Sequence, residues 1–292
     1  MWFYFALLSA FLNSLGNVAR RTHGSLAQPA ELAWWSLLFG MPLGVGLVLI
    51  NHEPFFTSYD FVVPAVVGSS ISCFASCMLF KAYKYGDASA VSPLTNMLPI
   101  VLVVTSFLIL GVLPGWYGLL GIFLVAAGVY YSSVSGRHKL AHPMGQLMKN
   151  KGSRSMMYWV VLVSIVVVLM SVALRSASAS FLLLFMQVVE FGLLSVYLLL
   201  RPQKHRLKHG ENVIRKWGWH IAAISLFSTM GVFFQFQAMN LADPNYVMAV
   251  KRLDVLMTVL LAGLFLHEKH ILRRFKGSAL AIVGVVVILL FG

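Results

Sequence analysis

The sequence consists of long apolar runs separated by short polar stretches. Runs of 17–22 mostly apolar residues recur along the whole chain, and about 20 residues of helix are needed to cross the hydrocarbon core of a bilayer. The runs do not alternate apolar and polar residues, as the strands of a membrane β-barrel do. We place ten spans, near residues 2–19, 31–50, 62–83, 89–110, 115–134, 157–174, 179–200, 219–239, 246–266 and 275–291. The pattern predicts an all-α polytopic membrane protein with ten transmembrane helices.

Composition supports this class and excludes a soluble domain. Of the 292 residues, 59% are hydrophobic and only 11% are charged, so a soluble fold could not bury the apolar surface. The first run lacks a basic n-region and an A-x-A cleavage site, so we interpret it as a span rather than a removed signal peptide. We expect a multi-pass protein of the cytoplasmic (inner) membrane, whose surroundings are the lipid bilayer.

The net charge of +13 is distributed unevenly between the two ends of the predicted spans. Nineteen of the 22 Lys and Arg residues follow odd-numbered spans: two, two, five, six and four after spans 1, 3, 5, 7 and 9. The opposite side holds only Arg175, and Lys251 and Arg252 lie inside the ninth span. Because Lys and Arg accumulate on the cytoplasmic side, both termini are predicted to lie outside. This placement argues against a nucleic-acid partner, although the 201–216 connector could also dock a protein or anionic lipid.

The second half of the chain repeats the first at an offset of 156 residues. FKAYKYGDASAVSPLTN (80–96) aligns with FQAMNLADPNYVMAVKR (236–252), and about eleven of the fifty positions from 80 to 129 are identical. An odd number of spans per copy inserts the second copy upside down, and such inverted repeats form a site near the bilayer midplane. We therefore expect a first repeat at 1–135, a basic connector at 136–156 and a second repeat at 157–292.

The ninth span contains three charged residues, Lys251, Arg252 and Asp254. Each charge costs roughly 2.5–3.5 kcal/mol at a helix centre, so this ridge should face the bundle interior or a water-filled cavity. Lys251 and Asp254 are three residues apart and share a face. In the repeat register, Lys251 and Arg252 correspond to Thr95 and Asn96 on the fourth span, and we expect all four as candidate substrate ligands at matching depth. The alternative is a salt-bridged pair that only orients helices.

Other polar side chains inside the spans are weaker candidates. Glu190 lies in the middle of the seventh span with Gln187 one turn before it, and it could carry a proton or act as a counter-ion to Arg252 or Lys251. Asn13 and Asn17 lie on one side of the first span. They are candidate substrate ligands, although small polar side chains between membrane helices more often make packing hydrogen bonds.

No constellation in the sequence indicates an enzyme, a metal site or a cofactor. Cys73 and Cys77 are four residues apart and lack the C-x-x-C spacing. HEKH at 267–270 is not the zinc motif H-E-x-x-H, since its second His comes one residue too early. We expect no catalytic activity, no metal ion and no cofactor.

Two segments resemble the EamA-type drug/metabolite transporter superfamily. The segment LFLHEKHILRRFKGSALAIVGVVVIL resembles the end of its second repeat, in which a Glu closes the ninth span and a Gly opens the tenth, here Glu268 and Gly277. AVSPLTNMLPIVLVV resembles its fourth span. The first copy departs from the pattern at Val112, where the Glu would stand. The resemblance implies a 5+5-span secondary transporter; many bacterial members have an inside N-terminus, whereas the charge count here predicts the opposite.

The adjacent Lys251 and Arg252 also resemble the pair of the sugar-phosphate translocators in this superfamily, where it holds the substrate phosphate. Arg offers a planar fork to phosphate oxygens and Lys a compact point charge. Asp254 departs from that pattern and could neutralise a cation or take up a proton.

Three functions remain open at this stage. The first is a secondary carrier that moves a small anionic metabolite, including a phosphorylated one, by alternating access. The second is a proton-coupled exporter of amino acids or amphipathic compounds, in which Asp254 or Glu190 carries the proton. The third is a non-transporting membrane scaffold or lipid-handling protein. A carrier should be stabilised by its small-molecule substrate through mass action, whereas a scaffold should not. Direction of transport, coupling ion and oligomeric state do not follow from the sequence.

Overall fold

A computed structural model describes residues 1–23, 29–51, 59–85, 92–134, 150–200, 210–266 and 271–291 of the chain. Most of the described residues form helices, and none of them forms a strand. The first half comprises α1 (Trp2–His23), α2 (Pro29–Ile50), α3 (Tyr59–Tyr85), the 3-10 helix η1 (Ser92–Met97), α5 (Leu98–Leu110) and α6 (Trp116–Val134). The second half comprises α8 (Lys151–Ala173), α9 (Ala179–Leu200), α10 (Gly210–Met239), α11 (Pro244–Lys251), α12 (Leu253–Leu266) and α13 (Ile271–Phe291).

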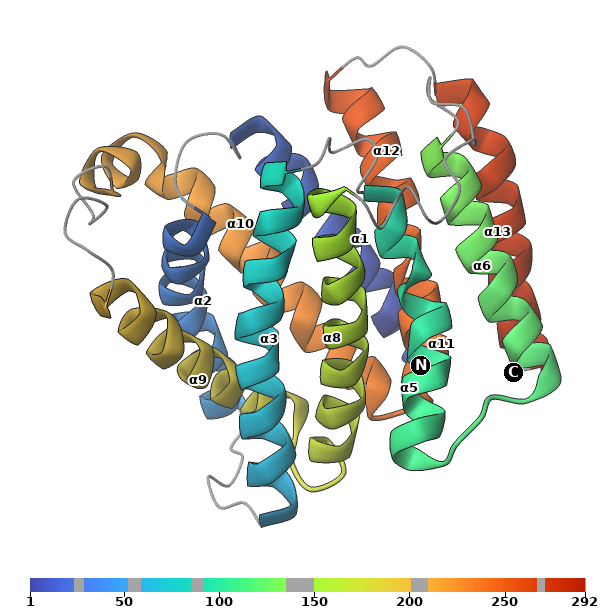
Figure 1. Cartoon of the computed structure of the whole chain (residues 1–292), viewed down its shortest axis with the longest axis horizontal. Helices are drawn as coiled ribbons and strands as arrows, with labels where there is room; N and C mark the ends of the chain where they lie inside the picture. Colours follow the sequence, from blue (N-terminus) through green and yellow to red (C-terminus); the bar gives the residue numbers. More distant parts are fainter. Residues whose placement is uncertain are drawn as a thin grey trace.

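The helices run up and down through one bundle (Figure 1). By length and composition, five described helical segments could cross a membrane: Ala33–Ile50, Tyr59–Leu79, Lys151–Ala173, Ala179–Leu200 and Gly218–Met239. Four shorter apolar stretches accompany them: Trp2–Gly16, Leu94–Leu110, Trp116–Tyr131 and Ala279–Phe291. The outer faces of the bundle carry exposed apolar side chains such as Leu108 and Phe123. A bilayer would cover such side chains, so the surface agrees with the predicted membrane class.

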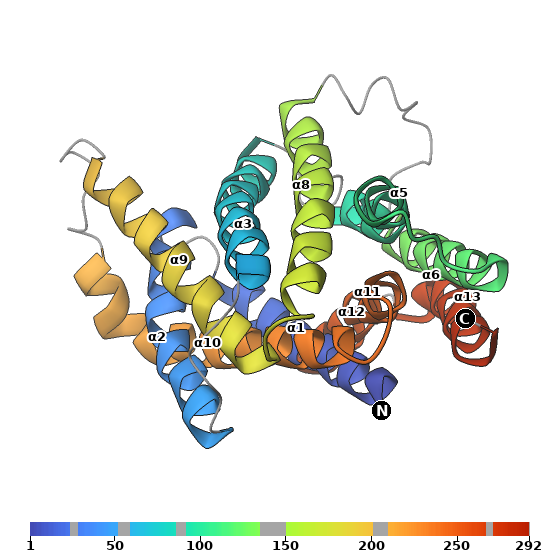
Figure 2. The same cartoon turned by 90° about the horizontal axis from the view of Figure 1, so that it is seen from below.

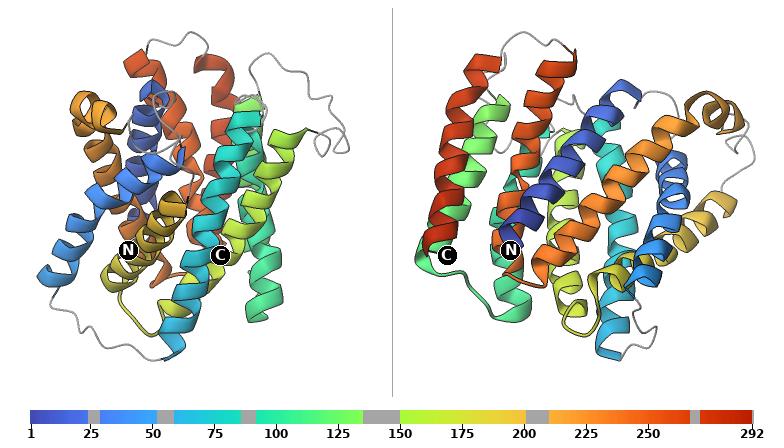
Figure 3. Two further views of the ribbon diagram at one scale, coloured as in Figure 1. Left: turned by 60° about the vertical axis from the view of Figure 1, so that its left-hand side comes forward. Right: turned by 180° about the vertical axis from the view of Figure 1, so that it is seen from behind.

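The two halves exchange equivalent contacts, as an inverted repeat requires. In the repeat register α1 corresponds to α8 and α3 to α10, and the structure packs α1 against α10 and α3 against α8. Likewise α11 and α12 pack against α1, whereas η1 and α5 pack against α8 (Figures 2 and 3). The helices that correspond to each other at the two edges, α2 with α9 and α6 with α13, pack together directly. The two-repeat, all-α architecture expected from the sequence is confirmed.

Glycines allow α6 and α13 to approach backbone to backbone. A Cβ on Gly284 would lie 2.6 Å from the Val125 nitrogen and 2.7 Å from the Gly121 carbonyl oxygen. A Cβ on Gly121 would lie 2.8 Å from the Gly284 oxygen and 2.6 Å from a side-chain carbon of Ile288. Without a hydrophobic driving force between helices in lipid, such close packing of small residues is what holds them together. This edge of the bundle is therefore a tightly joined pair.

Spans 4 and 9 differ from the uninterrupted helices that the apolar runs predicted. Span 4 is a 3-10 turn, η1, followed by α5, and Pro99 in the first turn of α5 has no N–H with which to continue the preceding helix. Span 9 consists of α11 and α12, which are separated at Arg252. There the hydrogen bonds join residues three apart, as in a 3-10 helix. The Arg252 N–H donates to the Ala249 carbonyl, and the Val255 N–H donates to the Arg252 carbonyl. Both interruptions fall at the same place in the repeat.

Candidate functional site

The break in span 9 places the three charges at helix ends that favour them. Lys251 is the last residue of α11, Arg252 is its C-cap, and Asp254 lies in the first turn of α12. A helix C-terminus carries partial negative charge and an N-terminus partial positive charge, each effect being about 0.3–1 kcal/mol. The interruption therefore stabilises this charged segment more than an unbroken helix would.

Lys251 reaches across to α10. Its ammonium donates a hydrogen bond to the Gln235 Oε1, and the Gln235 amide nitrogen in turn contacts the sulfur of Met239. Gln235 is itself buried. A neutral acceptor on α10 therefore helps to hold the ammonium in place.

Arg252 and Asp254 are both buried, each with 8% of its surface exposed. They interact electrostatically with each other, and Lys251 also acts on Asp254. The Nε of Arg252 and the Oδ1 of Asp254 nevertheless have no hydrogen-bond partner among the described residues. Buried polar atoms are nearly always hydrogen-bonded, so an unfilled donor and acceptor in a membrane span need a ligand, an ion or water to satisfy them.

Thr95 and Asn96 lie in η1, the counterpart of this segment in the first repeat. Thr95 is half-buried and Asn96 is 2% exposed. α5 ends at the face of the bundle where α11 begins, so the two helices are antiparallel (Figure 1), and Ser106 on α5 donates to Asn245 on α11 at 3.3 Å. Seven residues further along α11, Arg252 is about 10 Å deeper, near the level at which η1 meets α5.

The polar residues of α1 meet α10 rather than the charged segment in the contacts of the described side chains. Ser9 donates to the Gly231 carbonyl at 2.7 Å, and the Asn13 amide donates to the Ser9 carbonyl at 3.0 Å. Gly231 is one turn from Gln235, so this polar contact adjoins the partner of Lys251. Asn17 lies in α1, but its side chain is outside the described part of the structure.

Glu190 belongs to a second polar cluster, between α9, α3, α2 and α10. Its carboxylate bonds Ser72 on α3 and acts electrostatically on Cys73, and its Oε1 has no hydrogen-bond partner among the described residues. Nearby, Gln187 donates to the Thr229 hydroxyl at 3.2 Å, while its Oε1 is buried without a partner in the described chain. The hydrogen bond of the Glu190 carboxylate is thus with α3.

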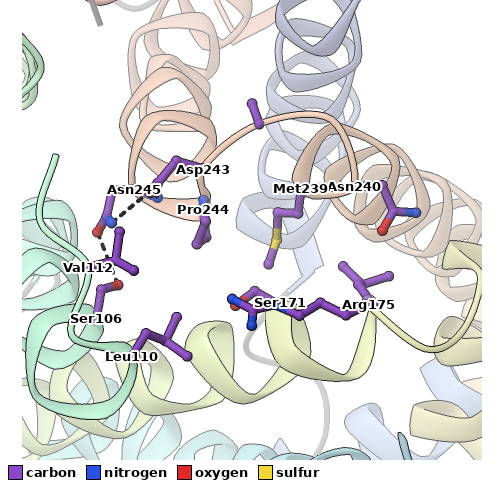
Figure 4. Close-up of a pocket in the computed structure, with 12 residues that line it drawn as sticks. Ser106, Leu110, Val112, Ser171, Arg175, Met239, Asn240, Asp243, Pro244 and Asn245 are labelled. Carbon is purple, nitrogen blue, oxygen red and sulfur yellow. Dashed lines mark hydrogen bonds between the residues drawn. The ribbon is translucent and has the colours of Figure 1, made fainter. Parts of the chain in front are cut away.

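A pocket of about 370 Å³ opens where α5, α8 and α10 end and α11 begins (Figure 4). Asp243 caps α11 by accepting bonds at 2.7 Å from both the backbone and the side-chain amide of Asn245, and Pro244 follows as the first helical residue. The full lining is Ser106, Leu110, Val112, Ser171, Leu174, Arg175, Met239, Asn240, Ala242, Asp243, Pro244 and Asn245. Polar and apolar groups thus meet in one cavity at the end of the bundle.

The comparisons with known proteins identify the family. The sequence matches the EamA-like transporter family over residues 1–134 and 153–290, nearly the whole chain. The chain belongs to the EamA-like transporter family. A solved crystal structure, described only as that of a protein, has a TM-score of 0.77 over 98% of this chain and 94% of its own, at 13% identity. No curated protein matches the sequence.

This EamA-like transporter is a multi-pass membrane protein, as the spans predicted. Its family consists of transporters, and no group of three or more His, Cys, Asp or Glu in the described residues could hold a metal ion. The orientation of the termini and the identity of the membrane stay predictions.

Sequence reasoning did not assign Gln235, Ser106 or Asn245 to a site. In the sequence, Gln235 is one of several polar residues of the eighth span. Its contact with Lys251 joins residues 16 apart on different helices, and Ser106 and Asn245 are 139 apart. The only local signal was Asp243-Pro244-Asn245, which is typical of a capped helix start.

Proposed function

We propose that this EamA-like transporter is a secondary carrier that moves a small anionic metabolite, including a phosphorylated one, by alternating access. The substrate's acid group would bind Arg252 and Lys251 at the interface of the two repeats, near the bilayer midplane. The observation that carries the proposal is the buried guanidinium of Arg252, whose Nε lacks a partner among the described residues. A buried guanidinium with an unused N–H can donate a hydrogen bond to an anionic oxygen of a substrate.

The broken helices support this location for the site. Discontinuous spans at corresponding positions of two inverted repeats are where secondary transporters bind substrate, because freed backbone groups and helix ends face the cavity there. Spans 4 and 9 are both interrupted at corresponding positions, near Asn96 and Arg252. Asp254 would balance Arg252 when no substrate is bound and would have to be displaced, or take up a proton, when an anion arrives.

A proton-coupled exporter is the second candidate, favoured by Glu190. A carboxylate buried between membrane helices with an unused oxygen is a natural proton carrier. In that case Glu190 or Asp254 would take up the proton, and Lys251 would hold the carboxylate of an amino acid or an amphipathic compound.

Variants of the two cations test the first proposal. Arg252→Gln and Lys251→Met should weaken binding of an anionic substrate about ten- to a hundredfold, since each removes a charge-assisted contact of roughly 1.5–3 kcal/mol. Arg154→Gln and Lys151→Met are matched controls, because these exposed cations lie in the first turn of α8. The measurements are the shift in unfolding temperature with phosphate esters and organic acids, and uptake into liposomes.

A purely structural ion pair predicts a different outcome. Removing one partner would leave a buried unpaired charge, at a cost of roughly 3–5 kcal/mol, and the variant without substrate would lose stability. Asp254→Asn separates the roles further: loss of a counter-ion should strengthen anion binding, whereas loss of a proton carrier should abolish the effect of a proton gradient. Normal uptake of every anion by both Arg252→Gln and Lys251→Met would refute the assignment.

A further inference from the structure

We propose that the pocket at the end of the bundle is a second binding site for the carrier's cargo, in which Arg175 holds the acid group of a small organic anion. The inference rests on the proposed function in that the ligand chemistry is the same. It adds a site about 10 Å from the charged break, measured along α11 from Asn245 to Arg252.

The first observation is the state of Arg175. This residue directly follows the C-terminal end of α8, and Figure 4 shows its side chain extending along the helix toward Ser171 and facing the pocket. Its guanidinium makes no hydrogen bond or ion pair with any residue in the described parts of the chain. It is also the single Lys or Arg that the sequence places on this side of the membrane. The cation therefore remains available to a ligand.

The second observation is the state of the acid in the same pocket. Asp243 is half-buried, and its Oδ1 accepts hydrogen bonds from the backbone N–H and from the side-chain amide of Asn245 at the start of α11. A carboxylate at this position is stabilised by the positive end of the helix, so part of its charge is already compensated. Asp243 is thus committed to capping α11, which leaves Arg175 to set the preference of the pocket for anions.

The remaining lining suits an anion with an apolar part. Leu110, Val112 and Met239 line the cavity together with Pro244. A volume of about 370 Å³ is within the range of small-molecule sites, which combine an apolar wall with a few placed polar groups. The pocket would therefore distinguish an organic acid from inorganic phosphate, which has no apolar part.

One face of span 9 carries both the pocket and the charged break. Asn245 on α11 and its C-cap Arg252 are seven residues apart, so their side chains emerge on the same face about two turns apart. Ser106 on α5 bonds Asn245 at the pocket. Cargo bound at Arg175 would therefore lie about two helical turns from the deeper site that we propose at Arg252.

A cysteine in the pocket can report binding there, and variants of the two arginines show which of them the binding needs. Asn240 is exposed and lines the cavity. The probe is phenyl phosphate, which joins an acid group to an apolar ring, and phenol is its uncharged control. In full-length protein carrying Asn240→Cys, Cys73→Ser and Cys77→Ser, the rate of maleimide labelling at position 240 is followed by mass spectrometry. Phenyl phosphate should slow labelling, and phenol should not.

Three further variants locate the effect. Arg175→Gln should raise the concentration of phenyl phosphate needed to slow labelling about tenfold or more, because a charge-assisted contact is lost. Arg175→Lys should restore part of the protection. Arg154→Gln, which removes an exposed cation from the other end of α8, should leave protection unchanged. Arg252→Gln should also leave the protection of position 240 unchanged, since Arg252 belongs to the deeper site.

The result separates this inference from the proposed function. The pocket site is wrong if phenyl phosphate does not protect position 240 in the starting protein, or if it protects Arg175→Gln and Arg154→Gln equally. Neither result bears on Arg252, whose role is tested by the uptake assay. Protection that is lost in Arg252→Gln rather than in Arg175→Gln would show a single deep site and would also overturn it. Protection at position 240 that depends on Arg175, together with normal uptake by both Arg252→Gln and Lys251→Met, would support the pocket site and refute the deeper site.

Discussion

A single methyl group at Gly284 should loosen the pair formed by α6 and α13. In Gly284→Ala the new Cβ would lie 2.7 Å from the Gly121 carbonyl oxygen and 2.9 Å from the Leu124 Cβ. Ordinary contact begins at 3.4 Å, so the first distance is short by about 0.7 Å in an interior that has no free volume to absorb it. Because the closest atoms belong to backbone, no side-chain rotation relieves the clash, and the two helices must separate.

The expected cost follows from overpacking. Inserting one methyl into a close-packed contact costs roughly 1–3 kcal/mol. For a chain of this size that corresponds to a fall in unfolding temperature of roughly 2–10 °C. The assay is thermal unfolding in detergent, followed by tryptophan fluorescence at one scan rate for all variants.

Gly192→Ala provides the matched control. Gly192 lies inside α9, and a Cβ there would meet nothing within 4 Å. Alanine is favoured over glycine in a helix by about 1 kcal/mol, so this variant should be neutral or slightly more stable. An unfolding temperature of Gly284→Ala equal to or above that of Gly192→Ala would show that the backbones of α6 and α13 are not in contact as described.

Three other changes have expected outcomes. If the charge count sets the orientation, Asn240→Cys should react with an impermeant thiol reagent in intact cells and Arg154→Cys should not; the reverse would place the termini inside. If Glu190 carries the coupling proton, Glu190→Gln should remove the dependence of liposome uptake on a proton gradient, and retained dependence would exclude that role. Gln235→Leu removes the acceptor of the Lys251 ammonium and should lower stability by about 1–3 kcal/mol, measured as unfolding temperature; an unchanged temperature would show that this hydrogen bond is not needed.

The sequence alone determined the membrane class, the ten spans and the repeat. These properties depend on the length and polarity of continuous segments, because the bilayer sets how many apolar residues each span needs. The repeat followed from residue identities at one offset, without any contact between helices. Lys251 and Arg252 were also evident from the sequence, since charges inside an apolar run are costly wherever the run is placed.

Only the tertiary structure showed the two helix breaks, although residues in the sequence account for one of them. Pro93 and Pro99 lie at the interruption of span 4, and proline lacks the N–H that continues a helix. The interruption at Arg252 has no proline or glycine, and the apolar periodicity passes through it without a change.

Only the tertiary structure decided which polar groups lie together. From the sequence, Glu190 could be a proton carrier or a counter-ion to Arg252 or Lys251, and packing of α9 against α3 places it beside Ser72. In the sequence Arg175 was notable only as the lone cation on its side, and the convergence of four helix ends places it at a pocket. Such contacts join residues up to 222 positions apart, and they depend on how helices rotate and cross when they pack, which one helix's own sequence does not specify.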